Sequence, residues 1–419
     1  MKDDVCSTIE RSKYFLLLAI TTTLPFSTNL NSWLIILFVA LTIYGISRNS
    51  MNSAGDLQLL VPVLALFALY LYGVFVTEIK WQELKGLEQK LSLLALPGVL
   101  FYSPPLSKQR LFYLLLSFTL SCFVVSLLTF REGFGFLFAE HRVWALDDLL
   151  LMHRPFLGLY CVASLFILIY LFLNSRGAVL RGLTILLFLF FLVYVYIINA
   201  KMAALAFIIA GYCTANLFLW KKQEYAIVSW INIVCVASTI IVYYSSGGVQ
   251  KFMQTLLYFE HFSYSEYNSM MVDSFNVRFG IWKCCKEVLL SNFIWLTGTG
   301  IIESKSLLHQ CYIDNSFEHQ AEFKFDSHNQ YLGIWMSAGI FGLIVYCGVL
   351  LYLLWTAYSR QQYLYFSIIM LFSICCITEG MMNSQKGILF FSLFYTLFTF
   401  QEKDQTEKKS YMYSTNINL

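Results

Sequence analysis

Long apolar runs recur along almost the whole sequence, and each is close to the roughly 20 residues that a helix needs to cross a bilayer. The 419 residues are 58% hydrophobic and only 13% charged, whereas soluble domains carry about 25% charged residues. Length and hydropathy predict about twelve spans, at residues 14–30, 33–47, 57–77, 88–103, 109–130, 155–174, 179–199, 202–220, 227–245, 330–355, 363–380 and 387–400. The sequence therefore predicts an all-α polytopic membrane protein.

One long polar segment interrupts these spans. It divides the chain into about nine spans in residues 1–245, a large loop in 246–329, about three spans in 330–400 and a polar tail in 401–419. Loops of this length usually contain structure of their own. An amphipathic helix is predicted by the three- and four-residue spacing of its apolar side chains, Phe275, Phe279, Trp282, Cys285 and Leu289. Ser274 could cap the start of this helix. We therefore expect short helices in the loop.

The distribution of basic residues predicts the orientation in the membrane. With a cytoplasmic N-terminus, half of the 28 Lys and Arg residues fall in cytoplasmic segments, and fewer fall in the short external loops. Cytoplasmic loops are enriched in Lys and Arg, so both termini are expected in the cytoplasm and the large loop outside. The N-terminal apolar run lacks a signal-peptide cleavage site and is interpreted as an uncleaved first span.

Several functional classes find no support in the sequence. The net charge of +3 is small and the basic residues are scattered, which argues against nucleic-acid binding. No phosphate-binding loop, nucleophile elbow or dinucleotide fingerprint occurs, and no metal-ligand motif. The acidic pair Asp147-Asp148 is interpreted as part of a solvated loop. We therefore expect neither a metal nor a cofactor.

The cysteines fall into two groups. Most of the eleven lie inside apolar runs, where Cys behaves as a small hydrophobic residue. Cys284, Cys285 and Cys311 lie in the large loop. Cys311 could form a disulfide with either member of the adjacent pair, and the sequence does not decide between them or require the bond.

A few polar residues lie where spans meet the outside. His328 and Asn329 precede a span, where the imidazole could accept a proton from a hydroxyl nucleophile or where both residues could cap the helix. Arg278 is either a solvated charge or a fork that binds phosphate. Lys201, between two spans with almost no loop, either snorkels or lines a polar cavity. Glu379 is either an acid at a cavity or the end of a helix.

Three segments resemble parts of a known family. They are NVRFGIWKCCKEVLLSNFIWLTGTG (Asn276–Gly300), with an Arg, an aromatic-containing helix and a Gly-x-Gly; SHNQYLGIWMSAGIFGLIVY (Ser327–Tyr346), with a His-Asn-x-x-Leu leading into a Gly-containing span; and ITEGMMNSQKGILFF (Ile377–Phe391). With about twelve spans and one large late external loop, the chain resembles the O-antigen ligase and O-antigen polymerase family of bacterial inner membranes.

The resemblance implies a metal-independent, inverting glycosyltransferase without a cofactor, surrounded by membrane lipids. It would move a glycan from undecaprenyl diphosphate to an acceptor on the periplasmic side: lipid A–core for a ligase, a second lipid-linked glycan for a polymerase. The family's catalytic His and its two phosphate-binding Arg residues correspond to His328, Arg278 and Lys201. Lys201 departs from the pattern, because Lys supplies a point charge and no bidentate fork.

Other functional classes stay open from the sequence alone. A transporter or flippase for lipid-linked sugar is one alternative, although the inverted repeats common in transporters are not seen. A non-enzymatic membrane scaffold is another. Ligase and polymerase are not distinguished, and neither the sugar nor the oligomeric state can be derived.

Overall fold

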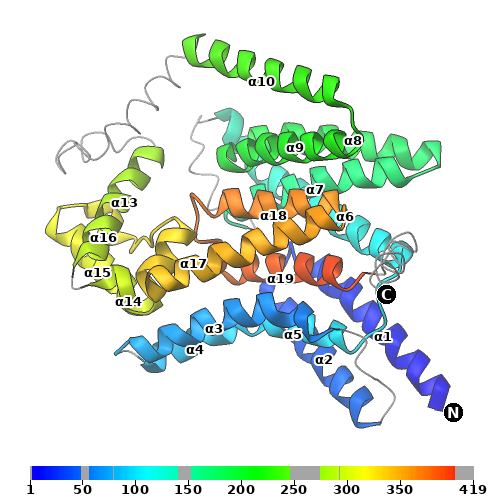
Figure 1. The fold of residues 1–419 in the computed structure, drawn as a ribbon, viewed down its shortest axis with the longest axis horizontal. Coiled ribbons are helices and arrows are strands. Elements are labelled where there is room, and N and C mark those ends of the chain that lie inside the picture. Colours follow the sequence, from blue (N-terminus) through cyan, green and yellow to red (C-terminus); the bar gives the residue numbers. More distant parts are fainter. Residues whose placement is uncertain are drawn as a thin grey trace, which may run out of the picture. The chain divides into compact units, whose positions relative to one another are not determined.

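The protein is helical throughout the part that the structure describes. A computed structural model describes residues 2–48, 56–78, 80–139, 152–245, 274–291 and 293–401 (Figure 1), and no strand occurs in these ranges. This confirms the all-α prediction. Asp147-Asp148, residues 246–273 of the predicted loop and the tail from residue 402 lie outside the described residues.

The helices follow the apolar runs closely. Their bounds are α1 Lys2–Thr23, α2 Thr28–Ser47, η1 Leu57–Leu60, α3 Val61–Val76, α4 Lys80–Lys90, α5 Ser92–Phe101, α6 Lys108–Ala139, α7 Arg154–Asn174, α8 Ala178–Ile197, α9 Lys201–Lys221, α10 Tyr225–Ser245, α13 Ser274–Leu290, α14 Ile294–Thr297, α15 Ile301–Asp314, α16 Glu318–Glu322, α17 Gln330–Ser359, α18 Tyr363–Cys375, η4 Met381–Asn383 and α19 Gln385–Thr399.

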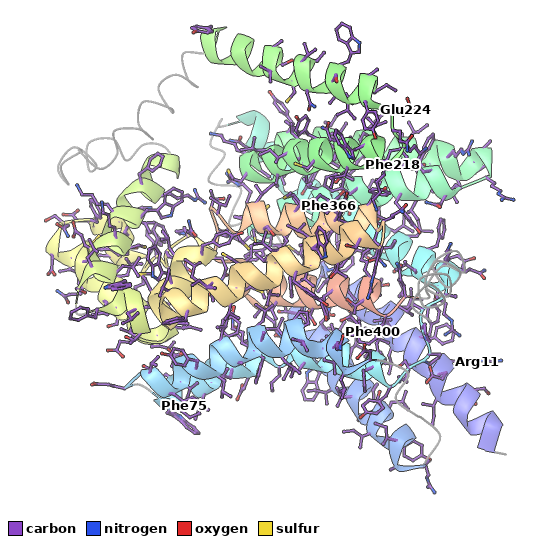
Figure 2. The ribbon with its side chains drawn as sticks, in the orientation of Figure 1. Arg11, Phe75, Phe218, Glu224, Phe366 and Phe400 are labelled. Carbon is purple, nitrogen blue, oxygen red and sulfur yellow. A yellow bond between two sulfur atoms is a disulfide. The ribbon has the colours of Figure 1, made fainter. Side chains whose placement is uncertain are left out.

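Several helices have the length and the surface of membrane spans. Among the described residues, seven are long and apolar enough to cross a membrane: α2, η1 with α3, α6, α7, α8, α9 and α17. Large apolar side chains are left uncovered on them: Phe75 on α3, labelled in Figure 2, is 72% exposed, and Val179 on α8 is 88% exposed. Such surfaces suit contact with lipid. The chain is a multi-pass membrane protein, and the full count of spans stays a prediction.

Several predicted spans have the wrong limits, among them 363–380, because α18 ends at Cys375. The range 14–30 is not one helix, because α1 ends at Thr23 and α2 starts at Thr28, where the Ser27 hydroxyl accepts a hydrogen bond from Leu30 N at 3.3 Å. The range 88–103 is divided between the polar helix α4 and the ten-residue helix α5. Polar and capping residues thus end helices within stretches whose average hydropathy predicts a single span.

The chain forms two compact units, and the first consists of residues 1–64, 91–199 and 385–419. In it α1 packs on α2 and α6, α6 on α7, α7 on α8, and α19 on α5. The side chains of α19 from Gly387 to Phe398 are all buried. Lys13 of α1 is 2% exposed and donates to Tyr102 O at 3.0 Å. A cation at the end of α5 supplies a partner that the last helical carbonyls need.

The second unit, residues 65–90 and 200–384, contains the predicted loop helices. α13, α14, α15 and α16 gather around the first part of α17 (Figure 1) and share one hydrophobic core with Met336 of that helix. Phe279, Cys285 and Leu289 are buried in this core, which confirms the predicted amphipathic helix; the side chain of Phe275 is not described. Ser274 is the first residue of α13.

A disulfide joins two of the loop helices. It links Cys284 of α13 to Cys311 of α15, whose Cα atoms lie 6.0 Å apart, and Cys285 is a buried free thiol. Of the two pairings that the sequence left open, the structure therefore contains the first.

The glycines of the family-like segments meet at a kink in α17. Gly339 interrupts the helix with φ 68° and ψ −172°, and a Cβ at this position would lie 2.1 Å from Leu296 O. One turn earlier, the Met336 and Ser337 carbonyls accept hydrogen bonds from Thr299 N at 3.0 Å and Gly300 N at 2.9 Å. The Gly-x-Gly loop therefore docks, backbone to backbone, against the kink.

We expect Gly339→Ala to destabilise the protein by about 3 kcal/mol or more, because it adds both backbone strain and a steric clash. The measurement is the thermal unfolding midpoint of the purified protein in detergent. Gly348→Ala is the matched control on the same helix, since nothing lies within 4 Å of a Cβ there. Equal midpoints for the two variants would contradict the docking role of Gly339.

Candidate functional site

The start of α17 separates the roles of two neighbouring polar residues. The Asn329 side-chain oxygen accepts a hydrogen bond from Leu332 N at 3.0 Å, so Asn329 is the helix cap. His328 does not supply the cap. Its φ is +41°, a left-handed conformation that residues other than Gly rarely adopt. Such backbone strain is often found at functional sites.

The His328 ring is held from one side by carboxylates. Its Nδ1 lies 3.1 Å from Glu379 Oε1 and 4.0 Å from Asp326 Oδ1. Because a carboxylate only accepts hydrogen bonds, Nδ1 carries the proton. No residue of the described part of the chain bonds to Nε2. This arrangement leaves Nε2 as the basic nitrogen, held in a fixed direction.

Glu379 connects His328 to Arg278. Glu379 Oε2 lies 3.5 Å from Arg278 Nη2, and Arg278 Nε donates to Thr378 O at 3.0 Å. The side chains of Glu379 and Arg278 are only 10% and 20% exposed. The fold thus brings together a His, an Arg and a Glu that the sequence singled out separately.

Asp326 is part of the same cluster, although the sequence did not single it out as a site residue. Its Oδ1 accepts from His328 N at 2.9 Å, and its Oδ2 accepts from Asn383 Nδ2 at 2.9 Å. A Cβ at Gly380 would lie 2.5 Å from Asn383 Nδ2, so only glycine lets Asn383 approach. The Asp-x-His spacing was the available signal, because such a carboxylate can bond to the backbone two residues later.

The cluster shifts the pKa values of two of its members. Burial alone would lower the pKa of His328, but the hydrogen bond and charge of Glu379, with the charge of Asp326, outweigh it and raise that pKa. Arg278 acts in the opposite direction. Burial alone would raise the pKa of Asp326, but the charge of His328 and the hydrogen bonds from Asn383 and His328 N hold it below its usual value. The imidazole is thereby made a stronger base.

The two carboxylates and the imidazole of the cluster could also bind a metal ion. Asp326, His328 and Glu379 each offer a ligand atom, and these atoms lie within 4.8 Å of one another. A divalent cation could bind them only if Nδ1 gave up the proton that it shares with Glu379. The cluster is therefore either a carboxylate-held base or a cation site, and the two uses differ in their response to chelators.

Lys201 is placed differently from the other candidates. It is the first residue of α9 and its side chain is exposed. The described contacts of His328, Glu379 and Asp326 do not include it. Its role in binding a phosphate stays a prediction.

Comparison with known proteins agrees with the resemblance seen in the sequence. The model of the family described as O-antigen ligase matches residues 159–347. The matched range contains Lys201, Arg278 and His328, while Glu379 follows it. No curated protein matches the chain. Residues 159–347 are therefore similar to the O-antigen ligase family.

Proposed function

We propose that the protein transfers a glycan from undecaprenyl diphosphate to a hydroxyl of lipid A–core at the periplasmic face of the inner membrane. The observation that carries the proposal is the position of Glu379, which accepts a hydrogen bond from His328 and forms an ion pair with Arg278. One carboxylate thus orients a base and a phosphate-binding cation side by side. Glycosyl transfer from a diphosphate needs both.

The residues suggest how the reaction proceeds. His328 Nε2 takes the proton of the acceptor hydroxyl, whose oxygen attacks the anomeric carbon from the face opposite the diphosphate. The new carbon–oxygen bond forms as the bond to the diphosphate breaks, and the diphosphate leaves with the electron pair. This displacement inverts the anomeric configuration. Glu379 and Asp326 stabilise the imidazolium, and Arg278, with Lys201 as a second cation, stabilises the leaving group.

The disulfide supports the proposed side of the membrane. Disulfides form and persist in oxidising compartments such as the bacterial periplasm. The Cys284–Cys311 bond lies in the helices that carry Arg278 and pack against the segment with His328. A periplasmic position of this bond agrees with the orientation predicted from the excess of basic residues in the segments expected to be cytoplasmic.

Purified protein in liposomes tests the function. Lipid-linked donor is supplied with lipid A–core in one sample and alone in another. We expect a covalent glycan–core product only when lipid A–core is present. Lengthening of the lipid-linked glycan without core would show a polymerase, the second candidate. Movement of donor across the bilayer without any new bond would show a transporter.

Glu379→Gln should lower transfer by about 10- to 100-fold, a part of what a positioned base contributes. Transfer requires neutral His328, so the rate rises with pH as His328 loses its proton. Glu379 raises the pKa of His328, so the variant's rising limb should move to lower pH. The measurement is the transfer rate between about pH 5 and 9. If the rise of the transfer rate occurred at the same pH in the variant, Glu379 would not set the pKa of His328. Glu224→Gln, at an exposed position, is the matched control.

A further inference from the structure

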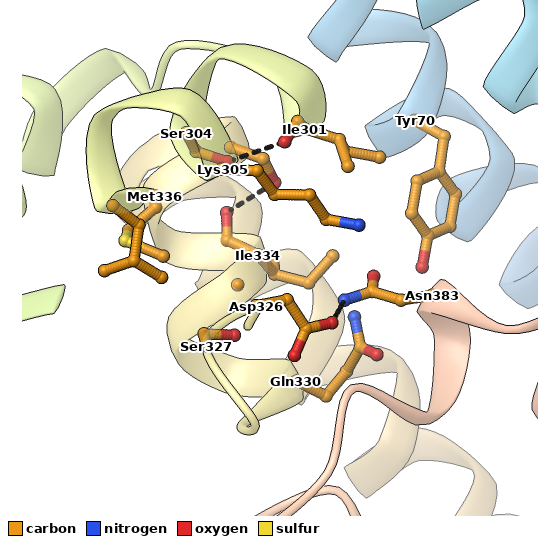
Figure 3. A pocket seen from close by; sticks show the side chains of 13 residues that line it. Tyr70, Ile301, Ser304, Lys305, Asp326, Ser327, Gln330, Ile334, Met336 and Asn383 are labelled. Carbon is orange, nitrogen blue, oxygen red and sulfur yellow. Dashed lines mark hydrogen bonds between the residues drawn. The ribbon is translucent and has the colours of Figure 1, made fainter. Parts of the chain in front are cut away.

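A pocket with both polar and apolar walls lies directly beside the His328 cluster. Figure 3 shows Tyr70, Lys305, Asp326, Gln330 and Asn383 around it. Its empty volume of about 330 Å³ includes the open space at its mouth, and its enclosed part is about large enough for one water-sized group. It can therefore take the edge of a larger polar molecule.

Three hydrogen-bonding groups of the pocket have unused capacity. Tyr70 is 3% exposed, and its buried hydroxyl has no partner in the described part of the chain. Lys305 is an exposed residue that makes no hydrogen bond or ion pair with described residues, and its ammonium group points into the pocket. The Gln330 oxygen accepts from Met382 N at 2.6 Å, while its amide nitrogen is directed toward the same space. A buried hydroxyl without a partner is costly, so the pocket is built to receive a polar group.

The pocket walls are held in place by neighbouring contacts. Lys90 is 4% exposed, donates to the Met382 carbonyl and lies over the Tyr70 ring, 4.6 Å from its centroid. Met382 is thus bound on one side by Lys90 and on the other by Gln330. A preformed site loses less conformational entropy when a ligand binds.

The charges of the pocket favour a neutral ligand that both donates and accepts hydrogen bonds. Tyr70, Lys305 and Gln330 offer donors. The Asn383 amide oxygen and the Asp326 carboxylate offer acceptors, and the opposite charges of Asp326 and Lys305 leave the pocket without a preference for a charged ligand. A hydroxyl group matches this set, because it donates one hydrogen bond and accepts two.

We propose that this pocket is a sugar subsite, which takes a hydroxyl or hydroxymethyl group of a glycan bound next to the reacting bond. The inference rests on the proposed function and adds the place where the carbohydrate is recognised. Asp326 forms a wall of the pocket and also bonds to His328 N. A sugar bound here therefore contacts Asp326, which is itself hydrogen-bonded to the residue that supplies the base. The sugar belongs to either the donor or the acceptor glycan.

The test uses the full chain in liposomes and the variants Tyr70→Phe and Lys305→Met. Each should raise the KM for one of the two substrates by about 3- to 10-fold, the effect of one lost hydrogen bond, with kcat changed less than about 2-fold. The substrate whose KM changes identifies the source of the sugar. Tyr113→Phe and Lys85→Met make the same chemical changes at exposed positions outside the pocket and should leave both KM values unchanged.

A binding measurement separates this proposal from the proposed function. Lipid-free core oligosaccharide and lipid-free O-unit oligosaccharide, both released by mild acid, are each titrated against the liposome-bound protein by saturation-transfer NMR. One of them should bind, and more weakly to Tyr70→Phe and Lys305→Met. This result would support the subsite even if no transfer occurred. Normal transfer with unchanged KM values and unchanged oligosaccharide binding would overturn it and leave a pocket for water only.

Discussion

Replacing His328 with Ala is expected to reduce glycan transfer by roughly two to four orders of magnitude, the contribution of a positioned general base. An acceptor hydroxyl is a poor nucleophile at neutral pH, and Nε2 of His328 is the basic nitrogen that the cluster leaves unbound among the described residues. His328→Gln should lose as much, because an amide cannot take the proton. Transfer in liposomes, normalised to protein content, measures the loss.

Two comparisons make the His328 result specific. Donor binding should stay nearly unchanged, because the diphosphate is assigned to Arg278 and Lys201. His309→Ala, a change of the same kind on α15, should retain transfer, because His309 is not part of the cluster. Near-normal transfer by His328→Ala would remove the base from the mechanism.

Arg278→Ala should lower transfer by about 10²–10³-fold, the usual cost of removing one group that stabilises charge in the transition state. It should also weaken donor binding, unlike His328→Ala. Without the nearby guanidinium the pKa of His328 should rise further, since Arg278 normally lowers it. The remaining activity should therefore need a higher pH. Transfer rates and lipid-donor affinity, measured on the same liposomes, test both effects.

Arg278→Lys should not restore the activity. The guanidinium places Nε on Thr378 O and Nη2 near Glu379 Oε2, and an ammonium group cannot make both contacts in that planar geometry. Lys201→Arg should be tolerated, because a guanidinium keeps the positive charge and adds a bidentate fork. Full activity of Arg278→Ala would exclude Arg278 from the site.

The sequence predicted best where pattern and local chemistry agree. The apolar spacing of α13 and the polar His-Asn pair before α17 located both helices, since amphipathic periodicity and capping are local properties. The sequence shows the Gly-x-Gly that ends the segment Asn276–Gly300 and the glycines of the span after it, but the reason for these glycines is tertiary. The Gly339 backbone passes so near Leu296 that no side chain fits.

The cluster itself could not be assembled from the sequence. Asn383 and Glu379 reach Asp326 and His328 from a segment about fifty residues later, and nothing local specifies that approach. Gly380 permits it by leaving room for Asn383. The pocket beside Asp326 was missed for the same reason, because Tyr70 and Lys305 come from distant helices.

Chelation is the most direct test of the central claim, that a carboxylate-held His328 and cationic side chains carry the reaction. Asp326, His328 and Glu379 also have the geometry of a cation site, so the two accounts differ in one measurement. The transfer rate of the purified protein is compared before and after dialysis against EDTA, with Mg²⁺ or Mn²⁺ then added back. We predict the same rate throughout. Loss of transfer with EDTA and its recovery with either metal would contradict the account.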